Sequence, residues 1–224
     1  MNRALAYCGF CHRPEISLPA SGVQSATVKV MAAGELSLVW SEVEWPFVPE
    51  RMQKSAVEFH EVVHHLFRQV AVVPFRLLSV FDHESALAAF IAEHGRAFVE
   101  DLERLKDCVQ MECVIYPAPG RMEANAGSGA AYLQAKAKLL RAQDEHVHAV
   151  RESLGAVARD VRVREGKNGV RVFVLTTRGR ESEFRSAIER VPAPGLLSRR
   201  MSGPWPAAEF LSDRVRAPHV AGAS

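Results

Sequence analysis

Two histidines and a glutamate, in the pattern His60-Glu61-Val62-Val63-His64, are the residues of this chain best suited to chemistry. On a helix, an H-E-x-x-H pattern places two imidazoles on one face, where they can bind zinc, and leaves the glutamate to activate a metal-bound water. The pattern predicts, as one hypothesis, a zinc-dependent hydrolase. Phe67 and Val70 occupy the positions where a metzincin has glycine and its third histidine. Glu84 remains as a third ligand, at a generic spacing.

A second pattern, Cys8-Gly9-Phe10-Cys11-His12, matches the C-x-x-C-H motif of covalent haem attachment. Haem of that kind is attached outside the cytosol, and the apolar stretch 4–10 is too short for an export signal and lacks a cleavage site. Cys108 and Cys113 are five residues apart, which places them on opposite faces of a strand and not in one thiolate cluster. We therefore expect four reduced thiols and no metal or other cofactor.

Arg76 follows Val73-Pro74-Phe75 in a stretch, residues 72–81, that is typical of a strand, in which Pro74 indicates an edge strand or an early strand position. In such a strand Val73 and Phe75 share one face and Arg76 points to the other, where a covered guanidinium needs an acidic partner. Glu61, on the preceding predicted helix, is the expected partner. Because no nucleophile or base accompanies Arg76, the sequence favours a structural ion pair over a catalytic one.

Near the end of the sequence, Gly203-Pro204-Trp205-Pro206 is followed by Phe210. Proline fixes its own φ and restricts the residue before it, so Trp205 has little backbone freedom. Two interpretations remain open. In the first, Trp205 and Phe210 cover a core edge and hold the C-terminus on the second half of the chain. In the second, a rigid exposed tryptophan anchors a partner protein.

The elements that must position these residues can be read from hydrophobic periodicity. In the first half, strands are expected at 4–10, at 26–32 with 34–43, and at 72–81, and helices at about 50–70 and 84–106. In the second half, the expected order is a strand at 108–116, a helix at 130–158, a hairpin of 161–164 and 170–176, a helix at 181–190 and a strand at 196–201. This is the β-α-β-β-α-β order of a ferredoxin-like sheet with helices on one face.

The first half approximates the same order, with a loop in place of its first helix. We therefore expect an α+β protein of two lobes: a modified ferredoxin-like domain at 1–107, a ferredoxin-like domain at 108–212, and a flexible tail at 213–224. The 224 residues, 48% of them hydrophobic, suffice for two such cores. No apolar run approaches the length of a membrane span, so a cytoplasmic protein is expected.

Charge is unevenly distributed along the chain. Through Tyr116 there are 10 lysines and arginines against 15 aspartates and glutamates, and after it 18 against 11. The basic half lacks the interleaved aromatic residues that are typical of nucleic-acid binding. The asymmetry instead suits an acidic partner, or copies of the chain stacked head to tail.

The Gly-Pro-Trp-Pro-x-x-x-Phe segment resembles the signature of the gas vesicle protein F/L family, GvpL/GvpF, whose members are accessory proteins of gas vesicle formation. Four further stretches agree with that family in order and rough spacing: Ala6-Tyr7-Cys8-Gly9, His60-Glu61-Val62-Val63, Val73-Pro74-Phe75-Arg76 and Gly129-Ala130-Ala131-Tyr132-Leu133. Ala207-Ala208 replace the usual proline and tyrosine after Pro206, and Leu77-Leu78-Ser79 replace a typical Phe-Gly-Thr.

This resemblance implies a non-enzymatic, cytoplasmic or vesicle-associated protein that binds the small, very apolar shell protein of the gas vesicle and assists its assembly or nucleation. Other accessory proteins of the vesicle are further expected partners, and neither nucleic acid nor membrane is expected. The implied signature or partner-binding residues are His60, Glu61, Pro74, Arg76, Tyr132, Gly203, Pro204, Trp205, Pro206 and Phe210. No catalytic residue and no cofactor are implied.

Overall fold

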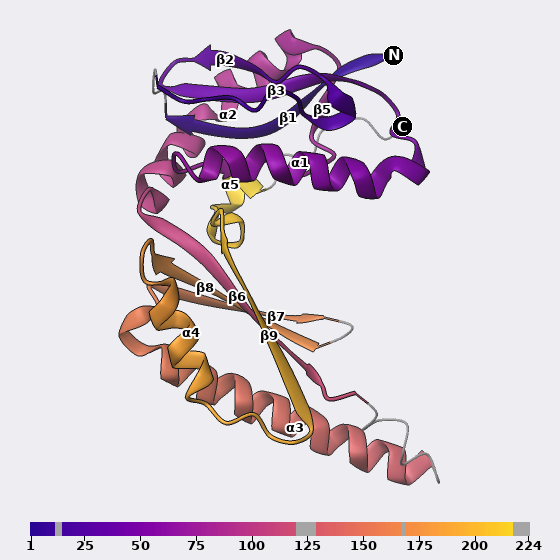
Figure 1. Ribbon diagram of the computed structural model, residues 1–224, viewed down its shortest axis with the longest axis vertical. Helices are drawn as coiled ribbons and strands as arrows, with labels where there is room; N and C mark the ends of the chain where they lie inside the picture. The colour runs from indigo at the N-terminus through magenta and orange to yellow at the C-terminus, as the bar shows by residue number, and fades with distance from the viewer. Residues whose placement is uncertain (12–14, 120–128, 167–168, 217–224) are drawn as a thin grey trace. The chain divides into compact units, whose positions relative to one another are not determined.

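The computed structural model of the protein describes residues 1–11, 15–119, 129–166 and 169–216 (Figure 1). It contains two compact units. The first is Met1–Asp107 together with the segment that begins at Trp205, and the second is Cys108–Pro204. Each unit has its own antiparallel sheet and its own helices, which confirms the expected α+β fold of two lobes.

The sheet of the first unit has the strand order β2-β3-β1-β4, and β5 pairs with β1 as well. Its strands are β1 (Asn2–Cys11), β2 (Lys29–Ala33), β3 (Leu36–Glu44), β4 (Val73–Pro74) and β5 (Val80–Phe81). Numbered along the chain, the order is 2-3-1-4, as in a ferredoxin-like sheet. Between β1 and β2, where that fold has its first helix, the structure has a 3₁₀ turn at Val23–Ser25. The hydroxyl of Tyr7 accepts the Val23 amide at 2.9 Å and holds this turn against the sheet.

The prediction of one strand over 72–81 was wrong. Two short strands lie there instead, pairing with opposite ends of β1. Between them the chain turns, because Ser79 N–H donates to the Arg76 carbonyl at 2.9 Å and the Ser79 hydroxyl accepts the Arg76 amide at 3.2 Å. Pro74 supplies no amide to a ladder, which favours an early end of the strand. Phe75 and Arg76 therefore do not alternate on a continuous strand.

Helices α1 (Met52–Phe67) and α2 (Glu84–Leu105) complete the first unit. A proline-led 3₁₀ turn at Pro49–Arg51 precedes α1, and the His83 ring caps α2 by accepting the Ala86 amide. Phe59 of α1 packs on Tyr7, and Phe98 of α2 lies close to Gly9. In β3, Leu36 and Leu38 lie toward α2, whereas Ser41 lies toward Tyr7.

All residues from Leu36 to Ser41 are buried, so helices cover both faces of this sheet. The sequence predicted helices on one face only. The addition of α2, which follows the ferredoxin-like order and packs on the second face, accounts for the difference. It also explains why residues 36–41 of β3 show no alternation of buried and exposed residues.

The second unit has the strand order β7-β8-β6-β9. In chain order its elements are β6 (Cys108–Pro117), α3 (Gly129–Leu154), β7 (Asp160–Gly166), β8 (Gly169–Thr177), α4 (Glu181–Glu189) and β9 (Leu197–Trp205). This is the ferredoxin-like order that the sequence predicted. Val109, Met111, Cys113 and Ile115 of β6 are fully buried, whereas Glu112 and Val114 on the other face are half-buried. Both helices lie on one side of the sheet (Figure 1), as expected.

The C-terminal boundary of the second domain differs from the prediction. The sequence placed 108–212 in the second domain, but the residues from Trp205 belong to the first unit. Phe210 is fully buried and Leu211 is 5% exposed, and their burial keeps this segment in that unit. Residues 213–216, expected to be part of a flexible tail, form the short helix α5 (Asp213–Arg216), in which Val215 is buried. The rest of the predicted tail, 217–224, lies outside the described residues.

Within the described ranges, no helix combines the length and the apolar character needed to cross a membrane.

Candidate functional site

His60 and His64 lie one helical turn apart on α1, and Trp205 packs against both of them. The two imidazole rings are stacked, with centroids 5.8 Å apart and planes 26° from parallel. The indole of Trp205 meets the His60 ring edge-on at 5.2 Å and the His64 ring at 6.4 Å. We call these three residues the His–Trp cluster. It joins two signature residues, His60 and Trp205, that are far apart in the sequence.

The backbone around Trp205 explains its position. Trp205 is the last residue of β9, and the following Pro206 is buried. The flanking prolines restrict the backbone on both sides, so the ring is held against α1 at a low entropic cost. Trp205 and His64 are half-buried, and His60 and Glu61 are exposed. The cluster is thus a rigid aromatic surface beside two polar residues, and not part of a closed core. The expectation that Trp205 packs on the second half of the chain was wrong, because its contacts are on α1 of the first unit.

The geometry of the two imidazoles differs from that of a zinc site. The rings stack face to face, whereas two zinc ligands point their nitrogens at a common centre. Among the described residues, no group of three or more His, Cys, Asp or Glu side chains could hold a metal ion, so Glu84 does not complete a site. Partial burial, with His60 and Arg68 nearby, lowers the pKa of His64. His64 is therefore neutral at neutral pH, which suits packing against an indole.

Pro74 and Arg76 meet the C-terminal segment at a small cavity of about 150 Å³. Residues on both sides line it: Pro74, Phe75, Arg76 and Ser79 from the turn, and Ala208, Glu209 and Leu211 from the segment. Arg76 is exposed. The predicted ion pair between Arg76 and Glu61 does not occur in the described part of the chain. The position of Arg76 in a turn, and not on a strand face, explains this difference.

A buried carboxylate ties the C-terminal segment to α2. Asp101 is 2% exposed and accepts hydrogen bonds from the Ser212 amide at 2.8 Å and the Ser212 hydroxyl at 3.0 Å. Arg104 donates to Asp101 at 2.6 Å and to the Phe210 carbonyl at 2.7 Å. We call Asp101, Arg104 and Ser212 the C-terminal clasp. Phe210, the last of the signature residues, therefore has a structural role: its ring is buried and its carbonyl accepts a hydrogen bond from the clasp.

Gly203 is also structural. Its φ of +108° is unfavourable for other residues, and a Cβ at this position would lie 2.8 Å from the Gln110 carbonyl oxygen and 2.9 Å from the Met111 sulfur. Pro204, next in the chain, is half-buried. Tyr132 differs from both, because it lies on α3 with 43% of its surface exposed. The structure thus brings together His60 and Trp205, places Phe210 in a core, and leaves Tyr132 separate in the second unit.

The thiols of the C-x-x-C-H pattern are poorly placed for haem. Cys8 is fully buried, and burial raises its pKa well above the usual range. Cys11 is half-buried, and His12 lies outside the described residues. All four cysteines are free of disulfide bonds, and burial raises the pKa of Cys113 to about 11. The thiols of Cys8 and Cys113 are therefore protonated and unreactive at neutral pH.

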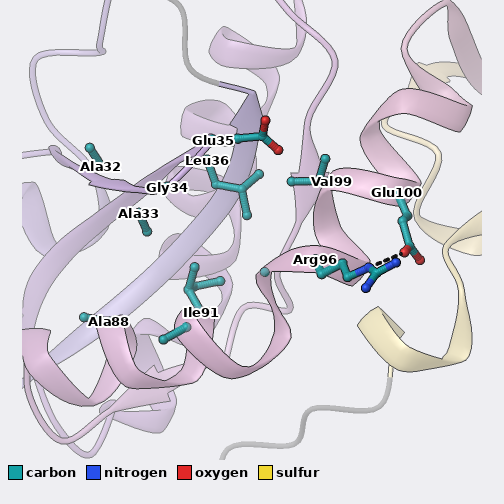
Figure 2. Close-up of a pocket in the computed structure, with 12 residues that line it drawn as sticks. Ala32, Ala33, Gly34, Glu35, Leu36, Ala88, Ile91, Arg96, Val99 and Glu100 are labelled. Atoms are coloured by element: carbon teal, nitrogen blue, oxygen red, sulfur yellow. Dashed lines mark hydrogen bonds and ion pairs between the residues drawn. The ribbon is translucent and has the colours of Figure 1, made fainter.

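Sequence reasoning missed a groove beside α2. Figure 2 shows its lining residues on this helix and on the turn that joins β2 to β3. Its volume is about 800 Å³. Small residues of α2, Ala88, Ala92 and Gly95, line it beside larger ones, and Leu36 of β3 lines it as well. We call this the α2 groove. The spacing of these small residues could have revealed it, but small residues facing a core give the same pattern.

Comparisons with known proteins agree with the fold and the motifs. The family model described as gas vesicle synthesis protein GvpL/GvpF matches residues 4–212. Two solved structures are similar, each at 14% sequence identity, a level that shows the fold alone. They are the gas vesicle protein GvpF from Anabaena sp. PCC7120, with a TM-score of 0.78, and GvpF from Microcystis aeruginosa, with a TM-score of 0.74.

The alignment to the Anabaena protein covers 95% of this chain and 97% of that one, and the alignment to the Microcystis protein covers 94% and 99%. No curated protein sequence matches significantly. The family match extends over almost the whole described chain. The chain therefore belongs to the GvpL/GvpF family of gas vesicle synthesis proteins.

Proposed function

We propose that this protein is a cytoplasmic, non-enzymatic accessory protein of gas vesicle formation that binds the hydrophobic shell protein and assists its assembly or nucleation. Contact with other accessory proteins of the vesicle is part of the same proposal. The family match supports the process. The physical need is plain, since an apolar subunit that awaits polymerisation aggregates unless a partner covers its exposed surface.

The observation that carries the proposal is the His–Trp cluster. A half-buried tryptophan, held between two prolines and packed on a helix, suits the anchor of a protein interface. Tryptophan offers a large apolar area and loses little side-chain entropy on binding. Phe210, whose position is structural, has its ring covered in a core. Trp205 and His60 instead leave part of their surface accessible beside the exposed Glu61.

Replacing Trp205 with alanine is expected to weaken binding of the shell protein by about 2 kcal/mol or more, roughly thirtyfold, as for other interfacial tryptophans. The measurement is a pull-down of co-expressed shell protein on tagged protein, followed by a titration of the purified pair. Trp45 provides a matched control, because it is half-buried in the same unit but packs on Phe47. Trp45→Ala should leave binding unchanged.

Equal retention of the shell protein by Trp205→Ala and by the wild type would exclude the His–Trp cluster as the contact. Unfolding of the variant would be visible as a lowered urea midpoint. For that case His60→Ala is the second variant, since His60 is exposed and its removal leaves the core intact. It should weaken binding by about threefold to tenfold, as a contact at the edge of a hot spot does.

A further inference from the structure

The first half of α3 contains no fully buried residue, although Ala131, Ala135 and Leu139 on one face are half-buried. Among the described residues 129–142, none is buried, and burial begins at Gln143. Large apolar side chains are exposed along this stretch: Tyr132 at 43%, Leu133 at 65% and Leu140 at 51%. We call residues 129–141 the α3 arm. Covering these exposed apolar side chains with an apolar surface would stabilise the arm.

The charge of the α3 arm limits what can cover it. Lys136, Lys138 and Arg141 are exposed, and the first acidic residue of the helix is Asp144. Pairing of two arms would bring six positive charges together, which is unfavourable. The leucines and the adjoining alanines form an apolar stripe between these cations. The arm therefore suits an apolar groove with an acidic rim.

The α2 groove of the same protein has these properties. Ala88, Ala92 and Gly95 on its α2 side are small, and an incoming helix can approach closely at these positions. Ile91, Arg96, Val99 and Glu100 of the same helix line the rest of that side. Glu35 stands on the turn at one side of the groove, and the Arg96–Glu100 pair stands across from it (Figure 2). Glu93 is exposed one turn before Arg96. Of these side chains, Glu35, Arg96 and Glu100 line the groove, so two carboxylates accompany one guanidinium and the rim carries a net negative charge.

We propose that the α3 arm of one copy of this protein docks in the α2 groove of a second copy. Leu133 and Leu140, two turns apart, would enter the groove, and the lysines and Arg141 would meet the acidic rim. The two surfaces of this contact differ, so the association is head to tail: a pair of docked copies still has one free arm and one free groove, and association continues beyond two copies. An interface of one helix in one groove is small, and we expect a weak association in the micromolar range.

Sedimentation equilibrium of the full-length protein tests the proposal. The mean mass should rise with concentration past that of a dimer, and raising the salt from about 0.05 M to about 0.5 M should weaken association at least fivefold through screening. Reversing the three arm charges with Lys136→Glu, Lys138→Glu and Arg141→Glu should weaken it by about tenfold or more. Association that stops at a dimer, or a wild type that stays monomeric at all concentrations, overturns the proposal.

A mixing experiment identifies the two surfaces. Leu133→Glu with Leu140→Glu disables the arm, and Ala92→Arg blocks the groove with a residue that an exposed helical position tolerates. Each variant alone should be monomeric, and their mixture should form a one-to-one heterodimer, because one intact arm and one intact groove remain. A monomeric mixture of folded variants contradicts the proposal. Binding of another protein to the arm of a monomeric wild type would also overturn it and would assign the arm to that protein.

Discussion

Replacing Gly203 with alanine should destabilise the protein by about 3 kcal/mol or more, since left-handed strain and overpacking each cost about 1–3 kcal/mol. The clash is with backbone, because the new Cβ would lie 2.8 Å from the Gln110 carbonyl oxygen in the adjacent strand. A strand pair cannot relax as a flexible side chain can. Arg185 also donates to the Gly203 carbonyl at 3.0 Å, and a shift of the strand would break that bond.

Gly179→Ala separates the two contributions. Gly179 also has a left-handed φ, +92°, but nothing lies within 4 Å of the point that a Cβ would occupy there. Its replacement should cost about 1 kcal/mol, from strain alone. Urea unfolding, compared at equal m-values, provides the measurement. Equal urea midpoints for Gly203→Ala and Gly179→Ala would show that β9 moves freely away from β6, so that the contact with the Gln110 carbonyl adds no cost at Gly203.

Replacing Asp101 with alanine should also be destabilising, by about 2–3 kcal/mol, because two hydrogen-bond donors of Ser212 lose their acceptor. The Ser212 amide and hydroxyl lose their acceptor, and Arg104 loses its nearest carboxylate. The cost of an unsatisfied buried donor exceeds the net gain of the bond that it made. The C-terminal segment should then separate from the first unit before the sheet unfolds.

Glu100→Ala is the control for Asp101→Ala, one residue away on the same helix. Glu100 is exposed and pairs with Arg96 at the surface, where such a pair contributes about 0–1 kcal/mol. Limited proteolysis reports on the segment directly, since cleavage near residue 211 should become fast in Asp101→Ala and remain slow in Glu100→Ala. Slow cleavage in both variants, with unchanged urea midpoints, would show that the clasp is not needed to hold the segment.

Periodicity predicted most elements because their patterns are strong. The β-α-β-β-α-β order of the second half was confirmed, as was the loop that replaces a helix in the first half. The single strand at 72–81 was wrong, because a turn closed by the Ser79 hydroxyl is a local bond that no hydrophobic pattern encodes. Helices on both faces of the first sheet were not predicted, because the sequence of a strand that is buried on both faces does not indicate which elements cover it.

The candidate site could be predicted only in part from the sequence. Gly203, Trp205 and Phe210 stand close together in the chain but have different surroundings: a backbone contact, a half-exposed ring and a core. No spacing rule separates these roles, because they depend on which distant strand or helix lies opposite. The meeting of His60 with Trp205 needs the long-range fold. The H-E-x-x-H pattern predicted two imidazoles on one face correctly, but not that an indole would pack on them.

Binding of the shell protein is tested most directly by co-expressing it with this chain and measuring the mass of the soluble fraction by size-exclusion chromatography with light scattering. The expected result is a defined complex that contains both chains, with less aggregated shell protein than in cells that lack this chain. Trp205→Ala should reduce the complex, and Trp45→Ala should not. Shell protein that aggregates to the same extent with and without this chain, and never elutes with it, would contradict the proposed function.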